Sequence, residues 1–456
     1  MKIAILGAAG VRTPLIVQAL ILRRSQDRLG LGELALMDID AERLELIAAL
    51  TGPLERAAAF SITRTTDARA ALSGADFVIT TFRVGGVESR AIDERVPLNH
   101  GVLGQETTGP GGFAMAMRTI PVLFHYIDLM REVCPGAWLL NFANPAGLLT
   151  EAVLRVAKWE RAVGICDAPP TMHKLAAAAI GAPLDEVLLE YFGLNHLGWV
   201  RSVMRNGRDH LPHLIEMIRA AGGLPGLPFD PEFIATLGLI PNEYLYYFYH
   251  NTEAVRNILN AGHSRGEQIA AMNASLFAEL RRLRATEDIE GMAAIYRRYI
   301  QERGQTYLAG ETGRAPDLSR LDPALAEAVS GEGYAGVALD LIEALQGEHP
   351  KRLIVNLANR GALRGMADED VVEIPALAGR NRIEPQAVGD VPDHCLGLMK
   401  QVKACEQLTI EAAVEGSYAK AVAALAIHPV VRDVAVARAI LDEYRVRHGA
   451  SFPALK

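Results

Sequence analysis

The sequence predicts an α/β protein, with a doubly wound parallel sheet in its N-terminal part and an α+β lobe after it. Over the first 165 residues, short apolar segments alternate with longer segments of helical periodicity, as in βαβ units of a parallel sheet. A glycine turn at 7–10 separates the first apolar segment from the first helical one, as it does in Rossmann-like sheets. After about residue 165 this alternation stops, and we expect the second lobe there.

The individual elements are predicted from apolar runs and their spacing. In the N-terminal part, strands are expected at 2–6, 33–38, 59–64, 75–80, 137–141 and 161–165, and helices at 14–24, 41–57 and 113–132. In the C-terminal part, two strands are expected around GLNH within 186–205 and others at 352–356 and 371–374, with helices at 268–303, 333–346 and 397–447. The glycine- and proline-rich residues 221–231 are expected to form a loop. We therefore predict two domains, 1–165 and 166–456.

The bulk composition argues against several classes of protein. Half of the 456 residues are apolar and the formal net charge is −8, which argues against a broad nucleic-acid-binding surface. The four cysteines, Cys134, Cys166, Cys395 and Cys405, contain no CxxC pair, so a reducing compartment fits better than a disulfide framework. Because no apolar run reaches about 18 residues, we predict no membrane span. Residues 2–6 run directly into Gly7 without a longer apolar stretch, so we predict no signal peptide. We expect a cytoplasmic protein that binds a small molecule.

The turn at residues 7–10 is a candidate dinucleotide-binding site. Backbone N–H groups between a strand and a helix can bind a pyrophosphate, and Asp38, at the end of the next strand, can bind ribose hydroxyls and favours NAD over NADP. The candidate cofactor-binding residues are Gly7, Ala8, Ala9, Gly10, Val11, Arg12 and Asp38. The full GxGxxG pattern is absent, so a tight turn without a ligand is the alternative. Asp40 is alternatively only a cap for the helix at 41–57.

Residues 83–112 are rich in glycine and charge and lack the periodicity of a helix or strand. We predict a long ordered loop there, and such loops are usually functional in compact domains. This segment and several later motifs resemble the signature of glycoside hydrolase family four. The matching motifs keep their order along the chain and are 83–112, Asn144-Pro145-Ala146, Gly164-Ile165-Cys166-Asp167, Gly193-Leu194-Asn195-His196, Pro241 to Tyr247, Asn356 to Gly361 and Glu373-Ile374-Pro375.

The resemblance implies an NAD- and divalent-metal-dependent glycosidase, an exception to the usual two-carboxylate mechanism. It implies a Rossmann-like N-terminal domain and a C-terminal α+β domain of the lactate/malate dehydrogenase type. NAD is expected to take a hydride from C3 of the sugar, after which a base removes the C2 proton and the aglycone leaves from C1. Water then adds and the hydride returns, while the metal acts as a Lewis acid. Family members commonly form dimers or tetramers, so we expect a homodimer or homotetramer.

The resemblance also implies roles for individual residues. Cys166 and His196 match the protein ligands of the metal, usually manganese, and Asp167 matches a proton donor. Tyr247 matches the catalytic base, and Tyr244 is the nearby alternative. The expected substrate-binding residues are Arg90, Asn144, Arg265, Asn195 and Glu106.

Taken by themselves, these residues leave simpler roles open. A thiolate and an imidazole favour zinc or another borderline metal, so manganese rests on the resemblance alone. Cys166 is alternatively a small buried hydrophobe, His196 a core histidine and Asp167 a helix cap. Arg90 and Arg265 are alternatively surface ion pairs, and the clustered tyrosines an aromatic core.

The expected substrate is an O-glycoside with an anion at C6, in the first place a 6-phospho-glucoside, because guanidinium groups bind phosphate well. Sulfoquinovosides, glucuronides and α-galactosides are alternatives within the same mechanism. The pair Cys166-Asp167 favours an α-linked substrate, whereas residues 83–112 resemble the phospho-β type, so the anomer stays open. Two other classes are an NAD-dependent 2-hydroxy-acid dehydrogenase without a metal and a non-enzymatic sensor of NAD or sugar.

Overall fold

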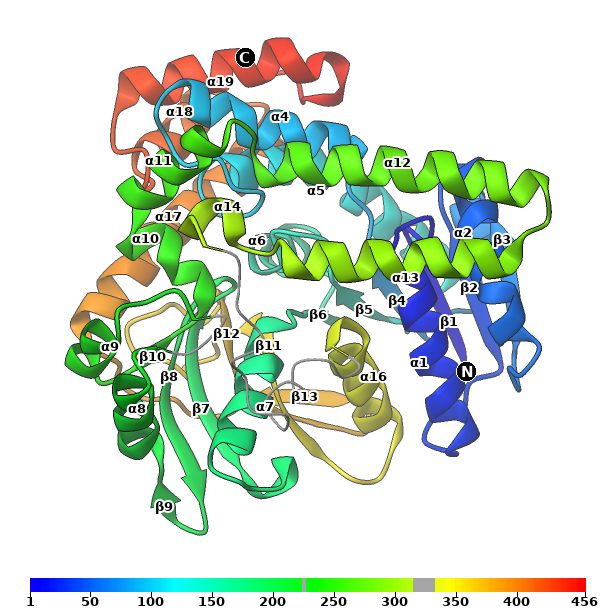
Figure 1. Cartoon of the computed structure of the whole chain (residues 1–456), viewed down its shortest axis with the longest axis horizontal. Coiled ribbons are helices and arrows are strands. Elements are labelled where there is room, and N and C mark those ends of the chain that lie inside the picture. The colour runs from blue at the N-terminus through cyan, green and yellow to red at the C-terminus, as the bar shows by residue number, and fades with distance from the viewer. Residues whose placement is uncertain (224–226, 315–332) are drawn as a thin grey trace.

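A computed structural model of the chain describes residues 1–223, 227–314 and 333–456. Its centre is a nine-stranded sheet with the order β13-β12-β11-β6-β5-β4-β1-β2-β3 (Figure 1). These strands are β1 (Lys2–Leu6), β2 (Glu33–Met37), β3 (Ser61–Thr65), β4 (Phe77–Thr80), β5 (Trp138–Asn141), β6 (Ala162–Gly164), β11 (Lys351–Ala358), β12 (Val371–Gly379) and β13 (Arg382–Pro385). The first six are mutually parallel and the last three run antiparallel to their neighbours. The predicted doubly wound parallel sheet is confirmed.

Helices cover both faces of this sheet. The helices of the N-terminal part are α1 (Thr13–Ser25), α2 (Ala41–Glu55), α3 (Ala68–Leu72), α4 (Gly86–Asn99), α5 (Pro110–Val133) and α6 (Ala146–Glu151). Side chains of β1 alternate between the faces, as strand geometry requires. Ile3 and Ile5 belong to an apolar cluster that includes α1, whereas Ala4 and Leu6 belong to one that includes α5. Burial on both faces explains why the strands are short apolar runs.

The C-terminal part adds a smaller antiparallel sheet and most of the helices. The sheet contains β7 (Leu188–Leu194), β8 (Leu197–Arg205), β9 (Arg208–Asp209) and β10 (Ile240–Pro241). The helices are α7 (Ala168–Ala179), α8 (Leu211–Ala220), α9 (Pro231–Leu237), α10 (Tyr246–Tyr249), α11 (Asn251–Ala261), α12 (Arg265–Ala285), α13 (Ile289–Gln305), α14 (Ala309–Thr312), α16 (Gly333–Gln346), α17 (Asp393–Glu415), α18 (Tyr418–Ala426) and α19 (Val434–His448). The predicted α+β character after residue 165 is confirmed.

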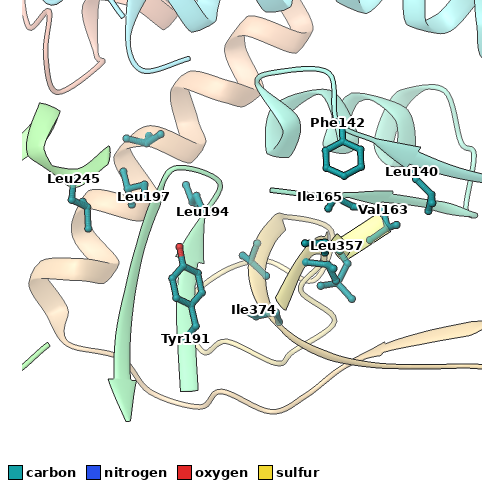
Figure 2. Packing of buried hydrophobic residues seen from close by; sticks show 14 of the residues in the cluster. Leu140, Phe142, Val163, Ile165, Tyr191, Leu194, Leu197, Leu245, Leu357 and Ile374 are labelled. Atoms are coloured by element: carbon teal, nitrogen blue, oxygen red, sulfur yellow. The ribbon is translucent and has the colours of Figure 1, made fainter. Parts of the chain in front are cut away.

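The two parts of the chain share one sheet and one core. β11 joins the parallel strands through the pair Asn356 and Gly164, so strands from both predicted domains lie in the same sheet. Leu140 of β5, Val163 of β6, Tyr191 of β7 and Ile374 of β12 belong to one apolar cluster (Figure 2). Residues that follow β6 are therefore held rigidly against the second sheet.

The predicted loop at 83–112 is wrong in part, because Gly86–Asn99 forms α4. This helix has no simple apolar stripe, since it buries charged side chains. Arg90 and Glu94 are both buried and pair with each other at 2.8 Å. A helix that buries ion pairs lacks the periodic apolar face by which helices are recognised in sequences.

Two other predicted helices are divided in the structure. The segment 268–303 forms α12 and α13, and the chain turns between them at Glu287, which has a positive φ of 56°. Asp288 then caps α13 by accepting the Gly291 N–H. The segment 397–447 comprises α17, α18 and α19. In the part of the chain that the structure describes, no helix is long and apolar enough to cross a lipid bilayer.

Candidate active site

The predicted site residues gather at the carboxyl ends of the parallel strands. The glycine turn follows β1, Asn144 follows β5 and Cys166 follows β6. The strand order reverses between β1 and β4, and ligands of open α/β sheets bind in the crevice at such a point. Gly7 has a φ of +96°, and a Cβ there would lie 2.5 Å from the Phe82 backbone nitrogen. Only glycine fits where the first turn passes so close to the segment after β4.

The glycine turn is held by the end of β2. The backbone N–H groups of Gly7 and Ala8 both donate to the Met37 carbonyl at 2.9 Å. The Asp38 carboxylate accepts the N–H of Ala9 at 2.8 Å through Oδ2. A carboxylate oxygen has more than one acceptor position, so Asp38 can hold the turn and still accept a ligand hydroxyl.

Asp40 has the alternative role that the sequence left open for it. It is the N-cap residue of α2 and accepts the Arg43 N–H. Its own N–H donates to Asp38 Oδ1 at 3.1 Å. Asp40 therefore caps α2, and Asp38 is the carboxylate beside the glycine turn.

His196 lies in the turn between β7 and β8, with a positive φ of 61°. Its Nδ1 is 2.8 Å from the Thr107 hydroxyl oxygen, and its ring stacks on Tyr244 with the centroids 3.8 Å apart. Burial lowers the pKa of His196 to about 4, so the imidazole is neutral at neutral pH. Because Thr107 engages Nδ1, Nε2 is the nitrogen that can bind a metal.

Cys166 is a buried thiol surrounded by carboxylates. Burial raises its pKa well above the ordinary value, and the charges of Glu373, Asp167 and Glu243 raise it further. A thiolate in these surroundings requires a cation, and a divalent metal deprotonates a bound thiol. If Cys166 were only a small buried hydrophobe, the three acidic side chains around it would have no explanation.

The donor set fits a catalytic metal site with open positions. Among the described residues, no group of three or more His, Cys, Asp and Glu side chains is arranged to hold a metal. Cys166 and His196 would supply two donors, and a substrate and water would supply the others. Open coordination positions are typical of catalytic rather than structural metal sites.

Glu373 is a buried acid that the sequence analysis named only as part of a motif. It accepts hydrogen bonds from the Tyr191 hydroxyl at 2.9 Å, Asn356 Nδ2 at 2.9 Å and Asn195 Nδ2 at 3.2 Å. Burial nevertheless raises its pKa to about 7. The sequence did contain one indication of its role, since Glu373 is a single acid inside the apolar strand Val371–Gly379. Charged residues in buried strands are rarely without a partner or function.

Glu243 adds to the same negative field. Burial, followed by the charge of Asp167 and that of Glu373, raises its pKa to about 7. Together with Glu373 it makes the region around Cys166 strongly acidic. These acids were missed because they lie far apart in the sequence.

Tyr244 and Tyr247 face different parts of the site. Tyr244 lies on His196, and its pKa is raised first by burial and then by charges that include Cys166 and Asp167. The Tyr247 hydroxyl instead donates to Glu311 Oε1 at 3.3 Å. Tyr244 is thus the tyrosine beside the Cys166–His196 pair.

Asp167 stands at the N-cap position of α7, but its side chain makes no capping hydrogen bond. The helix-cap role is therefore wrong for this side chain. Its Oδ2 lies 3.8 Å from Arg12 Nη1, and both side chains are partly exposed. Asp167 therefore lies near both Arg12, which follows the glycine turn, and Cys166, on which its charge acts.

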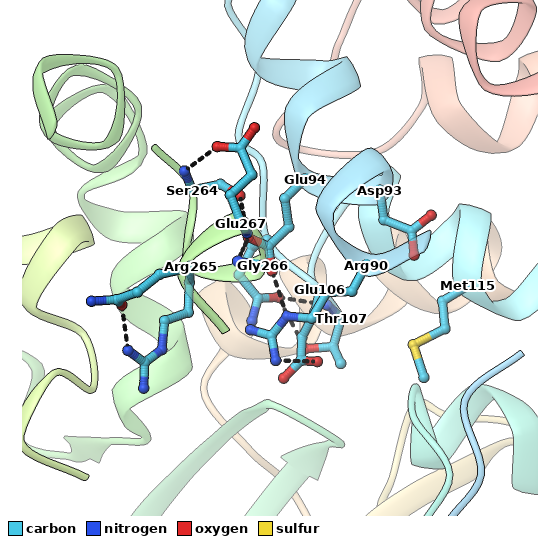
Figure 3. Close-up of polar contacts among 12 residues, drawn as sticks. Arg90, Asp93, Glu94, Glu106, Thr107, Met115, Ser264, Arg265, Gly266 and Glu267 are labelled. Carbon is cyan, nitrogen blue, oxygen red and sulfur yellow. Dashed lines mark hydrogen bonds and ion pairs between the residues drawn. The ribbon is translucent and has the colours of Figure 1, made fainter. Parts of the chain in front are cut away.

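The opposite end of the site is formed by arginines and their acid partners (Figure 3). Arg90 Nε donates to Glu94 at 2.8 Å, and Arg90 Nη1 forms an ion pair with Glu106 at 2.9 Å. Burial disfavours the Glu106 carboxylate, but Arg90 and Arg83 outweigh burial and hold its pKa at about 2. Arg90 is itself buried, so its role as a surface ion pair is wrong.

Arg265 begins α12 and lies beside this group. Its Nη1 donates to Thr306 Oγ1 and its Nη2 to the Arg303 carbonyl, both at 2.6 Å. Burial lowers its pKa, and the positive charge of Arg90 lowers it further. The guanidinium groups of Arg90 and Arg265 therefore repel each other. Among the described residues, no carboxylate forms an ion pair with Arg265.

The two predicted asparagines lie close together. Asn195 Oδ1 accepts the Ala146 N–H at 3.1 Å, and its Nδ2 donates to Glu373. Asn144 is joined to Pro145 by a cis peptide bond, just before Ala146. Asn195 therefore positions the segment that carries Asn144.

Comparisons with known proteins identify the family of this chain. The models of the family 4 glycosyl hydrolases match residues 2–182, and those of their C-terminal domain match residues 191–431. The chain is 33% identical to a probable 6-phospho-beta-glucosidase of Bacillus subtilis, over 99% of this chain and 97% of that one. It is 30% identical to a 6-phospho-alpha-glucosidase of Leptotrichia buccalis, over 100% and 99%.

Solved structures also match this chain over nearly its whole length. A 6-phospho-beta glucosidase from Thermotoga maritima, with manganese, NAD+ and glucose-6-phosphate, superposes with a TM-score of 0.83 at 29% identity and covers 100% of both chains. A 6-phospho-alpha-glucosidase from gut microorganisms, in complex with NAD and Mn2+, has a TM-score of 0.82 at 29% identity over 100% and 99% of the chains. The chain belongs to family 4 of the glycosyl hydrolases.

Proposed function

We propose that this enzyme hydrolyses 6-phospho-glucosides and that it uses NAD and a divalent metal ion, manganese in the first place. One observation carries this proposal: a single site joins an acidic end, at Cys166 and His196, to a basic end, at Arg90 and Arg265. Glu106 connects the ends, because it pairs with Arg90 and its charge acts on His196. The names and bound ligands of the relatives support a phosphate as the anion at C6.

The chain's own residues fit both groups. The turn after β1 and the Asp38 carboxylate would hold NAD, with Arg12 close to the site of its diphosphate. Cys166 and His196 Nε2 would hold the metal, and the surrounding carboxylates supply the negative field that a divalent cation neutralises. When bound, NAD supplies reversible hydride transfer at C3 and the metal supplies Lewis acidity toward the sugar oxygens.

We assign proton transfer to Tyr244 and Asp167. Tyr244 lies against His196 and would accept the C2 proton, because a nearby cation lowers the pKa of a phenol that burial otherwise raises. This assignment replaces Tyr247, whose hydroxyl is directed to Glu311. Asp167 is partly exposed at the edge of the site, where it would donate a proton to the leaving oxygen.

The test uses p-nitrophenyl glucosides of both anomers, each with and without a phosphate at C6. Both anomers are needed because relatives of both specificities match the chain at similar identity. Nitrophenol and NADH absorbance are followed together with NAD and manganese present. We expect release from a 6-phospho substrate without lasting NADH, and loss of release on adding a chelator.

Other outcomes discriminate between the alternatives. Lasting NADH that matches substrate consumption, without a metal requirement, would establish a dehydrogenase. Glucuronides and sulfoquinovosides are included, and a preference for either would replace phosphate by another C6 anion. In heavy water the product should carry deuterium at C2, and unlabelled product would contradict proton abstraction there.

We also propose a homodimer or homotetramer that works in the cytoplasm, with a domain division at residue 165 in which β11 to β13 of the second domain extend the sheet of the first. The support is the behaviour of the family and the small number of cysteines. Light scattering after size-exclusion chromatography gives the mass, and a monomer would contradict the oligomer.

A further inference from the structure

Arg303 is a half-buried arginine near the end of α13, and the site described above provides no role for it. Its Nη1 donates to the Tyr299 hydroxyl at 2.9 Å. Among the described residues, this is the one protein hydrogen bond of its guanidinium group. A guanidinium carries five N–H donors, so most of the donors of Arg303 remain uncommitted.

Positive charges converge around Arg303. Burial lowers its pKa, and the charges of Arg12 and Arg90 lower it further. The pKa of Arg265 is in turn lowered by burial, by Arg90 and by Arg303. Like charges held together in a partly buried site are unfavourable unless an anion binds them.

The nearby carboxylates offset this repulsion only in part, although the charge of Arg303 acts on Glu106. Glu106 is engaged by Arg83 and Arg90, and Glu94 is engaged by Arg90 and by the Gly266 N–H. None of these acids lies within ion-pair distance of Arg303. The arrangement therefore leaves positive charge for a ligand.

The surrounding contacts hold Arg303 in place. Tyr299, which accepts its hydrogen bond, donates in turn to Asn273 Oδ1 on α12. The Arg303 carbonyl accepts a hydrogen bond from Arg265 at 2.6 Å. Two turns before Arg303, the Tyr296 hydroxyl donates to the Val11 carbonyl at 2.8 Å, so α13 is anchored both to the segment after the glycine turn and to α12.

We propose that Arg303 is a further substrate-binding residue, which together with Arg90 and Arg265 binds the phosphate at C6. This inference rests on the proposed function. A phosphate monoester presents three oxygens and up to two negative charges, which several guanidinium groups can bind together. Arg303 then adds to the preference for phosphorylated over neutral sugars.

The test compares Arg303→Met with Arg298→Met. Arg298 lies on the same helix, its side chain is 66% exposed, and its partner Glu302 is 3.8 Å away. Both variants keep the backbone carbonyl at 303 that Arg265 uses. Calorimetry on the NAD-loaded protein measures glucose 6-phosphate and glucose, and a separate titration measures NAD.

We expect Arg303→Met to weaken glucose 6-phosphate binding about 10- to 100-fold, the effect of losing a hydrogen bond to a charged group. Glucose and NAD affinity should stay as in the wild type, and Arg298→Met should change none of the three. Arg303→Lys keeps the charge without the planar fork and should lie in between; it also serves if the methionine variant fails to fold.

Unchanged glucose 6-phosphate affinity in a folded variant would overturn the inference and leave the proposed function intact. A loss confined to NAD would also overturn it, because Arg303 would then bind the diphosphate of the cofactor. If the wild type binds no glucose 6-phosphate, both the inference and the proposed function fail.

Discussion

The two ends of the active site bury charges of opposite sign. At the acidic end, Glu243 and Glu373 have pKa values raised to about 7, and the Cys166 thiol is kept from ionising. At the basic end, Arg265 and Arg303 have lowered pKa values. Burial disfavours the charged form in both places, and the neighbouring like charges add to that effect.

The difference between the ends is which ligand relieves the repulsion. A divalent cation would stabilise the acidic end, whereas a phosphate would stabilise the basic end. Glu106 differs from both groups, because Arg90 and Arg83 keep it ionised. This carboxylate stays negative between the two ends, where it pairs with Arg90 and its charge acts on His196.

The largest expected effect comes from removing the proposed metal ligand Cys166 at the acidic end. Cys166→Ser should lower glycosidase activity by about a thousandfold or more, because Lewis-acid stabilisation is worth several kcal/mol. Manganese binding, measured by electron paramagnetic resonance, should weaken, while NAD affinity is kept. Cys395→Ser, at a buried cysteine on α17, is the control. Equal metal affinity in the wild type and Cys166→Ser would refute the assignment.

The two tyrosines test which groups belong to the acidic end. Tyr244→Phe should reduce kcat by about 10²- to 10⁴-fold, the usual contribution of a general base, and should stop deuterium exchange at C2. Tyr247→Phe removes only the hydrogen bond to Glu311, so kcat should change little and stability by about 1 kcal/mol. Deuterium exchange that is lost in Tyr247→Phe and kept in Tyr244→Phe would reverse the assignment.

Substitution of Arg90 tests how much the buried ion pairs of the basic end contribute to stability. Arg90→Met leaves Glu94 and Glu106 without their shared partner, and should destabilise the fold by about 3–5 kcal/mol. Arg69→Met removes an exposed pair with Glu132, whose side chains are 51% and 58% exposed, and should cost only about 0–1 kcal/mol. Urea unfolding measures both. Similar costs would show that Arg90 is not held as tightly as its contacts indicate.

The smallest expected effect concerns the protonation of Glu373 at the acidic end and its influence on stability. The folded-state pKa of Glu373 is about 7, above the ordinary 4.5, so its contribution to stability is present at low pH and is lost as the pH rises through that range. Glu373→Gln removes this dependence. In the metal-free protein, the Tm of the variant minus that of the wild type should therefore increase between about pH 5 and pH 8. A difference that is constant with pH would contradict the raised pKa.

Local patterns in the sequence predicted the fold well where a residue's environment depends on its neighbours in the chain. The parallel strands and the glycine turn followed from apolar runs and from Gly7. The helix Gly86–Asn99 was missed, because its polar residues are buried by partners such as Glu106 that lie elsewhere in the chain. Helical periodicity predicts only which face is apolar.

The site was predicted in part for the same reason. Cys166, His196 and Arg90 were named from motifs, and the structure brings them into one site. Glu373 and Arg303 received no role beforehand, since their significance depends on which charges face them after folding. The choice between Tyr244 and Tyr247 also needed the structure, because both lie on one short segment.

The sequence by itself determined that a parallel sheet would carry a glycine turn, an acid after its second strand and a Cys–His pair. These follow from local propensity and from the order of motifs along the chain. Only the tertiary structure decided that one end of the site is acidic and the other basic. The physical reason is that Coulomb energy depends on the distance between charges in space and on burial, and neither can be read from spacing in the sequence.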